Sequence, residues 1–205
     1  MGDPAPDPGV RGRLRRGLVG VIGVAGLVLA AVSVIALVLG GGPGHGDLVE
    51  GPVTIKALDS GLCLGERRGT GTGTGTGQVL QLACADAGVP SHSLERVGAP
   101  GDAHWRIVSR HPDRGPGCWG LPAGGRTPDA MLDDSTCGAP TRVETFTLHP
   151  YGTPPAGYRL TPAAPAPPDT CVTVGDEREA EGAGLVQAPC TPDAKGQVFV
   201  FERGE

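Results

Sequence analysis

The chain has 205 residues, enough for one domain with appendages, and includes 36 glycines and 21 prolines but only seven aromatic residues. Its 17 basic and 22 acidic residues give a net charge of −5, and because residues 1–16 contribute +2, the remainder carries −7. So acidic a remainder argues against nucleic acid as a partner, since phosphate binding needs a basic face.

The first predicted element is a membrane-spanning helix over residues 17–39. This segment carries no charge, and at ~1.5 Å per residue it reaches about 34 Å, against a hydrocarbon core of roughly 30 Å. Four arginines lie in the polar segment 1–16, which we expect to be a disordered cytoplasmic stub, and the first charge after the span is Asp47. The positive-inside rule then predicts a single-pass signal-anchor with the N-terminus in the cytoplasm and the C-terminal domain outside the cell.

A cleaved signal peptide is the rival interpretation of the same segment. Its apolar region normally covers about 7–15 residues and ends at an A-x-A-like site. The apolar run here is longer, and it continues into a Gly-rich linker, residues 40–50, without a clean site of that kind. We therefore expect a retained anchor, and the sequence leaves open whether the segment is cleaved.

The six cysteines recur as three pairs, with separations of 21, 19 and 19 residues within a pair. A repeat at a fixed period of about 50 residues indicates three copies of one structural unit. Six cysteines allow 15 pairings, but equivalent copies should form equivalent bridges, and an extracellular domain provides the oxidising compartment. The predicted disulfides are Cys63–Cys84, Cys118–Cys137 and Cys171–Cys190.

Each copy has four short apolar segments separated by Gly, Pro and Asp. One precedes the first cysteine, one contains it, one leads to the second cysteine, and one closes the copy. The first set is residues 53–55, 105–108 and 158–160; the third is 79–82, 131–132 and 185–187; the last is 93–95, 145–148 and 198–201. Three copies of four strands, over about residues 51–100, 101–153 and 154–203, predict an all-β fold, the β-trefoil: a six-stranded barrel capped by three hairpins.

Over residues 51–203 the chain resembles the ricin B-type lectin family. The third copy carries the resemblance most fully: Cys171-Val172-Thr173-Val174 stands for the G-x-C-L-D-V strand, Cys190 follows, and Gln197-Val198-Phe199 stands for the Q-x-W motif. The resemblance implies a β-trefoil and a carbohydrate-binding module. The best candidate sugar site lies in the third copy, with Thr173, Val186 and Gln197 as ligand-binding residues.

The chain departs from the family at the positions that contact sugar. Sugar-binding copies have an Asp two residues after the first cysteine, an aromatic residue two before the second, and an Asn before the motif Gln. The residues at the Asp position here are Gly65, Gly120 and Thr173; those at the aromatic position are Leu82, Ser135 and Ala188; those at the Asn position are Ser91, Val143 and Gly196. The resemblance therefore implies a retained fold with a degenerate sugar site.

The sequence contains few candidates for metal-binding or catalytic residues. None of the five histidines has zinc-like spacing to another ligand, and the cysteines are committed to disulfides, so we expect no metal and no cofactor. Asp133 and Asp134, beside Asp129, either form a solvated loop edge or bind a hard cation. Trp119 either fills the core or is an exposed binding anchor. No serine stands in a G-x-S-x-G motif, and we expect no enzymatic activity.

Two functions follow as expectations. The first is a membrane-anchored extracellular carbohydrate-binding module with a degenerate sugar site. The alternative is a β-trefoil that acts as a protein-interaction or structural module at the cell surface, without lectin activity. The expected partners are thus a carbohydrate or a cell-surface protein, together with the membrane through residues 17–39. Ligand identity and oligomeric state stay open.

Overall fold

The computed structural model describes residues 48–66, 77–88, 90–99, 104–163, 166–175 and 177–204. The predicted stub 1–16, the predicted span 17–39 and most of the predicted linker 40–50 lie outside these ranges. Within them, no helix combines the length and the apolar character that a membrane crossing requires. The described residues belong to one compact unit, His45–Glu205, which contains all three disulfides and the whole core discussed below.

Twelve strands and one short 3₁₀ helix, η1 (Pro122–Gly125), make up the regular structure of the described residues. The strands are β1 (Gly51–Ala57), β2 (Cys63–Glu66), β3 (Gly77–Leu82), β4 (Ser91–Val97), β5 (His104–His111), β6 (Gly115–Gly120), β7 (Asp133–Thr136), β8 (Phe146–Tyr151), β9 (Gly157–Pro162), β10 (Thr170–Val174), β11 (Leu185–Pro189) and β12 (Phe199–Arg203). All pairings between them are antiparallel. The all-β prediction is confirmed.

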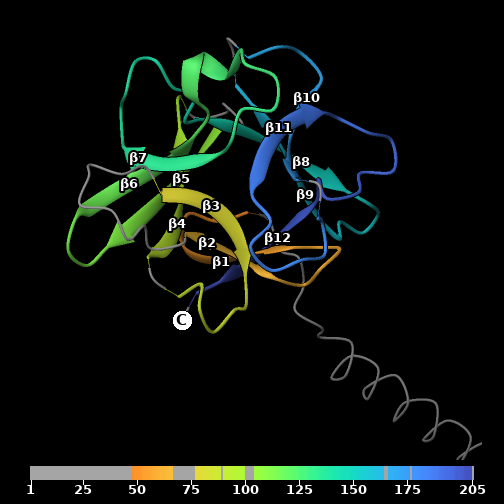
Figure 1. Ribbon diagram of the computed structural model, residues 1–205, viewed down its shortest axis with the longest axis horizontal. Helices are drawn as coiled ribbons and strands as arrows, with labels where there is room; N and C mark the ends of the chain where they lie inside the picture. Colours follow the sequence, from red (N-terminus) through yellow and green to blue (C-terminus); the bar gives the residue numbers. More distant parts are fainter. Residues whose placement is uncertain are drawn as a thin grey trace, which may run out of the picture. The chain divides into compact units, whose positions relative to one another are not determined.

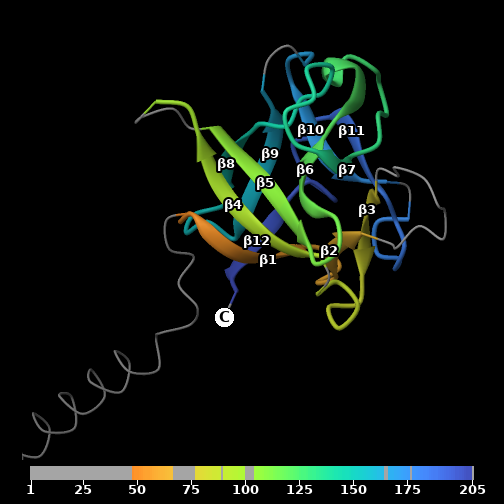
Figure 2. The ribbon, with the colours of Figure 1, turned by 90° about the vertical axis from the view of Figure 1, so that its left-hand side faces the viewer.

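Six of these strands close into a barrel. Neighbouring strands pair in the order β1, β4, β5, β8, β9 and β12, and β12 pairs back with β1 from Val53↔Arg203 to Ala57↔Phe199. The other six strands form the hairpins β2–β3, β6–β7 and β10–β11. Figure 2 shows the barrel strands on one side of the domain and the hairpin strands on the other. A six-stranded barrel with three hairpins is the predicted β-trefoil.

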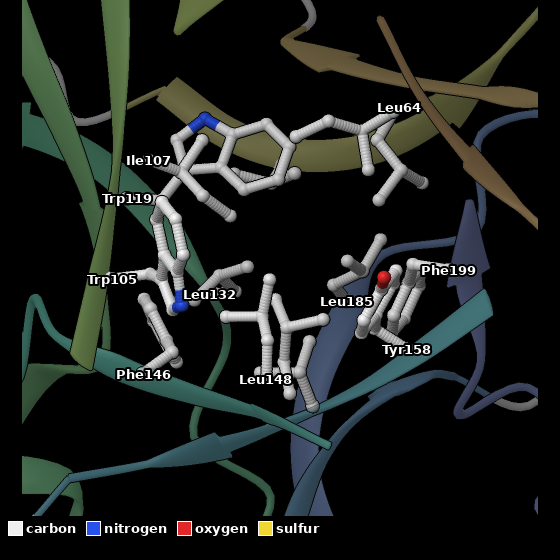
Figure 3. Close-up of a cluster of buried hydrophobic side chains, with 14 of the residues drawn as sticks. Leu64, Trp105, Ile107, Trp119, Leu132, Phe146, Leu148, Tyr158, Leu185 and Phe199 are labelled. Carbon is white, nitrogen blue, oxygen red and sulfur yellow. The ribbon is translucent and has the colours of Figure 1, made fainter. Parts of the chain in front are cut away.

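The three copies follow one another around the domain, as the orange-to-yellow, green and blue sectors of Figure 1 show. Their equivalent side chains meet in one core, where Figure 3 shows them converging. Nine of these side chains, three from each copy, are at most 1% exposed. They are Ile55, Ile107 and Leu160; Leu94, Phe146 and Phe199; and Val79, Leu132 and Leu185. Because apolar burial drives folding, we expect that one copy alone would leave these side chains exposed and would not be stable.

The predicted disulfides are all present within their copies. Their Cα–Cα distances are 4.8, 4.9 and 5.1 Å in chain order, inside the range that a disulfide spans without moving the backbone. Each bridge joins the strand that carries the first cysteine to the end of its own hairpin. The bridges limit the unfolded chain and so support a core with few aromatic residues.

One predicted strand lies elsewhere than expected. Residues 131–132 precede β7, which begins at Asp133. Leu132 still buries its side chain, but its backbone N–H donates to the carbonyl of Leu185, and Met131 forms an isolated bridge with Val186. These residues therefore link the second hairpin to the third, and the strand of the second hairpin starts two residues later.

Candidate functional site

The predicted sugar residues of the third copy lie together beside hairpin β10–β11. Thr173 on β10 is the cross-strand partner of Val186 on β11. The Gln197 side-chain nitrogen donates to the Thr173 hydroxyl at 3.1 Å and to the Pro189 carbonyl at 2.8 Å, and its oxygen accepts the Thr191 N–H at 2.9 Å. Gln197 is only 1% exposed. Through these hydrogen bonds, the Gln197 amide links hairpin β10–β11 to the segment just before β12.

In the second copy the residue that corresponds to Gln197 is Glu144, and the buried Arg142 lies beside it. Arg142 donates to the backbone carbonyls of Cys118 and Asp133, and it forms ion pairs with the Asp133 and Glu144 carboxylates. Its side chain is 8% exposed. A Cβ atom at Gly120, the position of the family's Asp, would lie 2.9 Å from the Val143 carbonyl oxygen. A larger side chain therefore has no room at this position.

In the first copy, apolar side chains fill the space around the position of the family's Asp. A Cβ atom at Gly65 would lie 3.2 Å from both Ala87 and Leu82, tighter than ordinary packing. His92, which corresponds to Gln197, is buried with its ring 4.8 Å from the Trp119 ring in an edge-on arrangement. Burial lowers the pKa of His92 to about 4, so the ring is neutral at neutral pH. This position is also part of the interior.

A second polar cluster lies where the first and second hairpins meet. We call Glu66, His111 and Asp134 the carboxylate–histidine cluster. The His111 Nε2 atom is 2.7 Å from Asp134 Oδ2 and 3.3 Å from Glu66 Oε2. The three side chains are only 9%, 5% and 3% exposed for His111, Asp134 and Glu66. They come from the ends of β5, β7 and β2, which the β3–β7 pairing brings together.

Burial is the main electrostatic influence on Glu66. It raises the pKa of Glu66 to about 9, and the neighbouring Asp134 carboxylate adds to the rise, while Arg114 and Trp119 oppose it. Glu66 is therefore a neutral carboxylic acid at neutral pH in the absence of a bound cation. A buried group with such a displaced pKa is typical of functional sites, although structural networks also produce it.

Two glycines make room for the carboxylates. A Cβ atom at Gly117 would collide with both Asp134 oxygens and with the buried Ser109 hydroxyl, and a Cβ atom at Gly77 would collide with Glu66 Oε2. A residue other than glycine at either position would have to displace a carboxylate of the cluster, and neither glycine has a positive φ that would itself favour glycine. The cluster occupies space that any other residue at these two positions would fill.

The sequence analysis missed this cluster because its members are 23 to 68 positions apart in the sequence. A signal was nevertheless present in the repeat. Glu66 lies three residues after the first cysteine of its copy, where the other copies have Leu121 and Val174. Asp134 lies three residues before the second cysteine, where the other copies have Gln81 and Gln187. Charged residues at positions that are apolar or neutral in the other copies mark this site.

The remaining predicted residues are placed as follows. Asp133 pairs with Arg142 and Asp134 contacts His111, because successive residues of a strand point to opposite faces. Asp129 is exposed, so the three aspartates do not converge on one cation. Trp119 is fully buried in the core, which confirms the core-filling interpretation. Figure 3 shows its ring among the apolar side chains.

No family model and no curated protein matches the chain. Solved structures do match. The designed three-fold symmetric protein ThreeFoil is 16% identical, with a TM-score of 0.58 over 73% of this chain and 96% of that one. The Rhizoctonia solani agglutinin is 16% identical, with a TM-score of 0.55 over 77% and 98%. A proteinase inhibitor from Coprinopsis cinerea is 11% identical, with a TM-score of 0.57 over 77% and 100%. At these identities the likeness concerns the fold: the chain contains a β-trefoil-like domain.

Proposed function

We propose that residues 51–203 form a non-enzymatic recognition module, displayed outside the cell on the apolar segment 17–39, whose ligand is a protein. The proposal is supported by the way the chain's own residues take up the three positions that the ricin B-type resemblance assigns to sugar contacts. Arg142 fills the second place, Ala87 and Leu82 crowd the first, and the Gln197 amide is used within the chain in the third. Loops on a rigid scaffold are where such a domain presents a recognition surface.

The fold itself is compatible with ligands of either class. The similar structures include a proteinase inhibitor as well as an agglutinin, so a trefoil of this shape serves both kinds of protein. The composition supports a protein partner over an anionic polymer, because the domain is acidic. The exposed loop between β10 and β11, with Glu177, Arg178 and Glu179, provides charged groups for such an interface.

Photo-crosslinking on intact cells tests this proposal. A crosslinking residue in place of Glu179, in the exposed β10–β11 loop, is expected to capture one defined protein. The same residue in place of His104, exposed on the barrel strand β5, is the matched control and should not capture it. Equal capture at both positions, or capture at neither, would contradict a hairpin-loop interface.

Carbohydrate binding is a second candidate, favoured by one observation. A cavity of about 390 Å³ is formed by the third copy and by His149 of the second. Its lining includes the polar side chains of His149, Thr161, Asp169 and Thr170, together with three prolines, one alanine and one cysteine. The exposed Asp169 carboxylate is suited to the hydroxyl groups of a sugar, since a hydrogen bond to a charged group contributes about 1.5–3 kcal/mol. The neighbouring threonine hydroxyls already bond to residues of the chain. This cavity differs from the place predicted from the ricin B-type resemblance.

Titration of galactose into ¹⁵N-labelled residues 45–205 separates these possibilities. We expect no chemical-shift change up to millimolar sugar, because the amide of Gln197 and the guanidinium of Arg142 already have partners. Shifts confined to Asp169 and Thr170 would favour the second candidate. Shifts around Thr173, Val186 and Gln197 would instead restore the lectin interpretation of the third copy.

The membrane topology has its own test. A reporter that is active only outside the cytoplasm should work when fused after Glu205 and fail when fused before Gly17. Replacing the four arginines of residues 11–16 by glutamate should weaken or invert that orientation, because it removes the positive-inside signal. A released protein that begins near Gly44 would show instead that the apolar segment is a cleaved signal peptide.

A further inference from the structure

We propose that Glu66, His111 and Asp134 bind one divalent transition-metal ion, with Zn²⁺ as the representative, and that this ion ties the first copy of the trefoil to the second. The proposal is independent of the ligand that the module recognises. One ligand atom from each of the three side chains lies within 4.8 Å of the others. The atoms come from β2, β5 and β7, so a bound ion would join a strand of the first hairpin to two strands of the second copy.

The two distances from His111 need little change to accept an ion, and the Glu66 and Asp134 ligand atoms lie within 4.8 Å of each other. In a tetrahedral site with bonds of about 2.0–2.1 Å, neighbouring ligand atoms are separated by about 3.3 Å. His111 Nε2 and Glu66 Oε2 are already 3.3 Å apart. His111 Nε2 and Asp134 Oδ2, at 2.7 Å, must separate by about half an ångström, which replaces their direct hydrogen bond by two metal bonds. A fourth position remains for a water molecule.

The cluster also has acceptor capacity that the described residues do not use. Among them, neither Glu66 oxygen nor Asp134 Oδ1 has a hydrogen-bond partner, although these atoms are buried. A buried carboxylate oxygen without a partner is costly, because it has lost its hydration. Buried charges in proteins are paired or coordinate metals. A cation between the two carboxylates removes this cost.

The donor set indicates the class of metal. An imidazole nitrogen with two carboxylates suits Zn²⁺ and its first-row neighbours, whereas Mg²⁺ and Ca²⁺ prefer all-oxygen sites. As metal ligands the two carboxylates together supply two negative charges, which a divalent ion balances. The equivalent residues of the other copies are uncharged. Leu121 and Val174 stand at the position of Glu66, and Gln81 and Gln187 stand at the position of Asp134.

Arg114 competes with the ion. Its guanidinium lies 3.3 Å from His111 Nδ1, where it can only donate, so in this arrangement Nε2 carries the imidazole proton. Metal coordination through Nε2 moves that proton to Nδ1 and requires Arg114 to turn away. Arg114 is exposed and free to do so. Its removal should therefore strengthen metal binding, a response opposite to that of the three ligands.

Calorimetric titration of Zn²⁺ into the EDTA-treated, tag-free domain, residues 45–205, tests the proposal. We expect one site per chain, and a melting temperature raised by roughly 5–10 °C at a zinc concentration about 100-fold above Kd. Glu66→Gln, His111→Gln and Asp134→Asn should each weaken binding at least about 100-fold, since loss of an outer partner alone costs 10- to 100-fold. Arg114→Ala should tighten it. The matched controls, His149→Gln and Glu95→Gln, alter exposed residues and should leave the affinity unchanged.

Other outcomes would overturn the assignment. Zinc binding that survives both Glu66→Gln and His111→Gln would belong to surface histidines. Equal affinity for Ca²⁺ or Mg²⁺ would exclude a site that depends on the imidazole. Co²⁺ adds an independent readout, because its visible absorption reports a nitrogen and oxygen site of low coordination number and should vanish in His111→Gln. Should Asp134→Asn fail to fold, Glu66→Gln keeps the test decisive, because that variant removes a buried acid and retains its shape.

Discussion

The free energy of unfolding of residues 45–205 is expected to fall as the pH rises from about 6.5 to about 9 in EDTA, and Glu66→Gln should remove most of that fall. The pKa of Glu66 is raised from 4.5 to about 9 by burial and by the Asp134 carboxylate. Between these values the folded state holds a proton that the unfolded state releases. Stability therefore decreases with pH, by up to about 1.4 kcal/mol per pH unit for one proton.

The pKa of His92 is shifted in the opposite direction, and this shift decides the pH range in which the effect of Glu66 can be measured. Burial lowers the pKa of His92 from 6.5 to about 4, so its contribution is complete above pH 6.5 and is lost as the pH falls toward 4. The two groups oppose each other between about pH 4.5 and 6.5, and of the two only Glu66 contributes above pH 6.5. Burial also raises the pKa of Asp133, so that carboxyl adds to the same trend. Urea unfolding at pH 6.5, 7.5 and 8.5 measures the effect.

The Glu66 comparison has a clear control. Glu95→Gln changes an exposed carboxylate in a long ion pair with Arg110 and should retain the wild-type pH slope. Glu66→Gln should be more stable than the wild type at pH 8.5, because it replaces a buried acid by a neutral group of the same shape. A wild-type domain whose stability is flat from pH 6.5 to 9 would show that Glu66 titrates near its ordinary pKa.

Arg142→Met is expected to destabilise the domain by about 3–5 kcal/mol, the usual effect of removing one partner of a buried ion pair. The variant leaves the Asp133 and Glu144 carboxylates facing each other without a cation, and it removes the donor to two backbone carbonyls. The methionine retains most of the side-chain volume, so the loss is mainly electrostatic. Urea unfolding at pH 7 gives the difference in free energy.

The matched control is Arg110→Met. Arg110 and its partner Glu95 are separated by 3.6 Å, with side-chain exposures of 61% and 44%, and a surface pair of this kind contributes about 0–1 kcal/mol. Combining Arg142→Met with Asp133→Asn and Glu144→Gln should recover part of the loss, because no unpaired charge then remains. Equal effects of Arg142→Met and Arg110→Met would mean that the Arg142 network does not stabilise the second copy.

The repeat explains why so much of the fold follows from the sequence. Three equivalent cysteine pairs determine both the disulfides and the number of copies, and hydrophobic segments at equivalent offsets locate eleven of the twelve strands. The exception, residues 131–132, bonds across to the third hairpin, and a pattern within one copy carries no information on such a contact. The sugar positions Gly65 and Gly120 could likewise be identified from spacing, whereas the arginine that fills the second position could not.

The sequence by itself determined the copies, the disulfides, the strand pattern and the absence of a carboxylate at the family's sugar positions, because each of these depends on residues close together in one copy. Only the tertiary structure decided what meets between copies. Glu66, His111 and Asp134 come together because β3 pairs with β7. Within the second copy, Arg142 acquires its partners because the neighbouring Val143 pairs with Leu121 and so returns the chain to the hairpin. Burial then changes the chemistry of these groups: the acid that would be ionised in water holds its proton in the interior, where charge is poorly solvated.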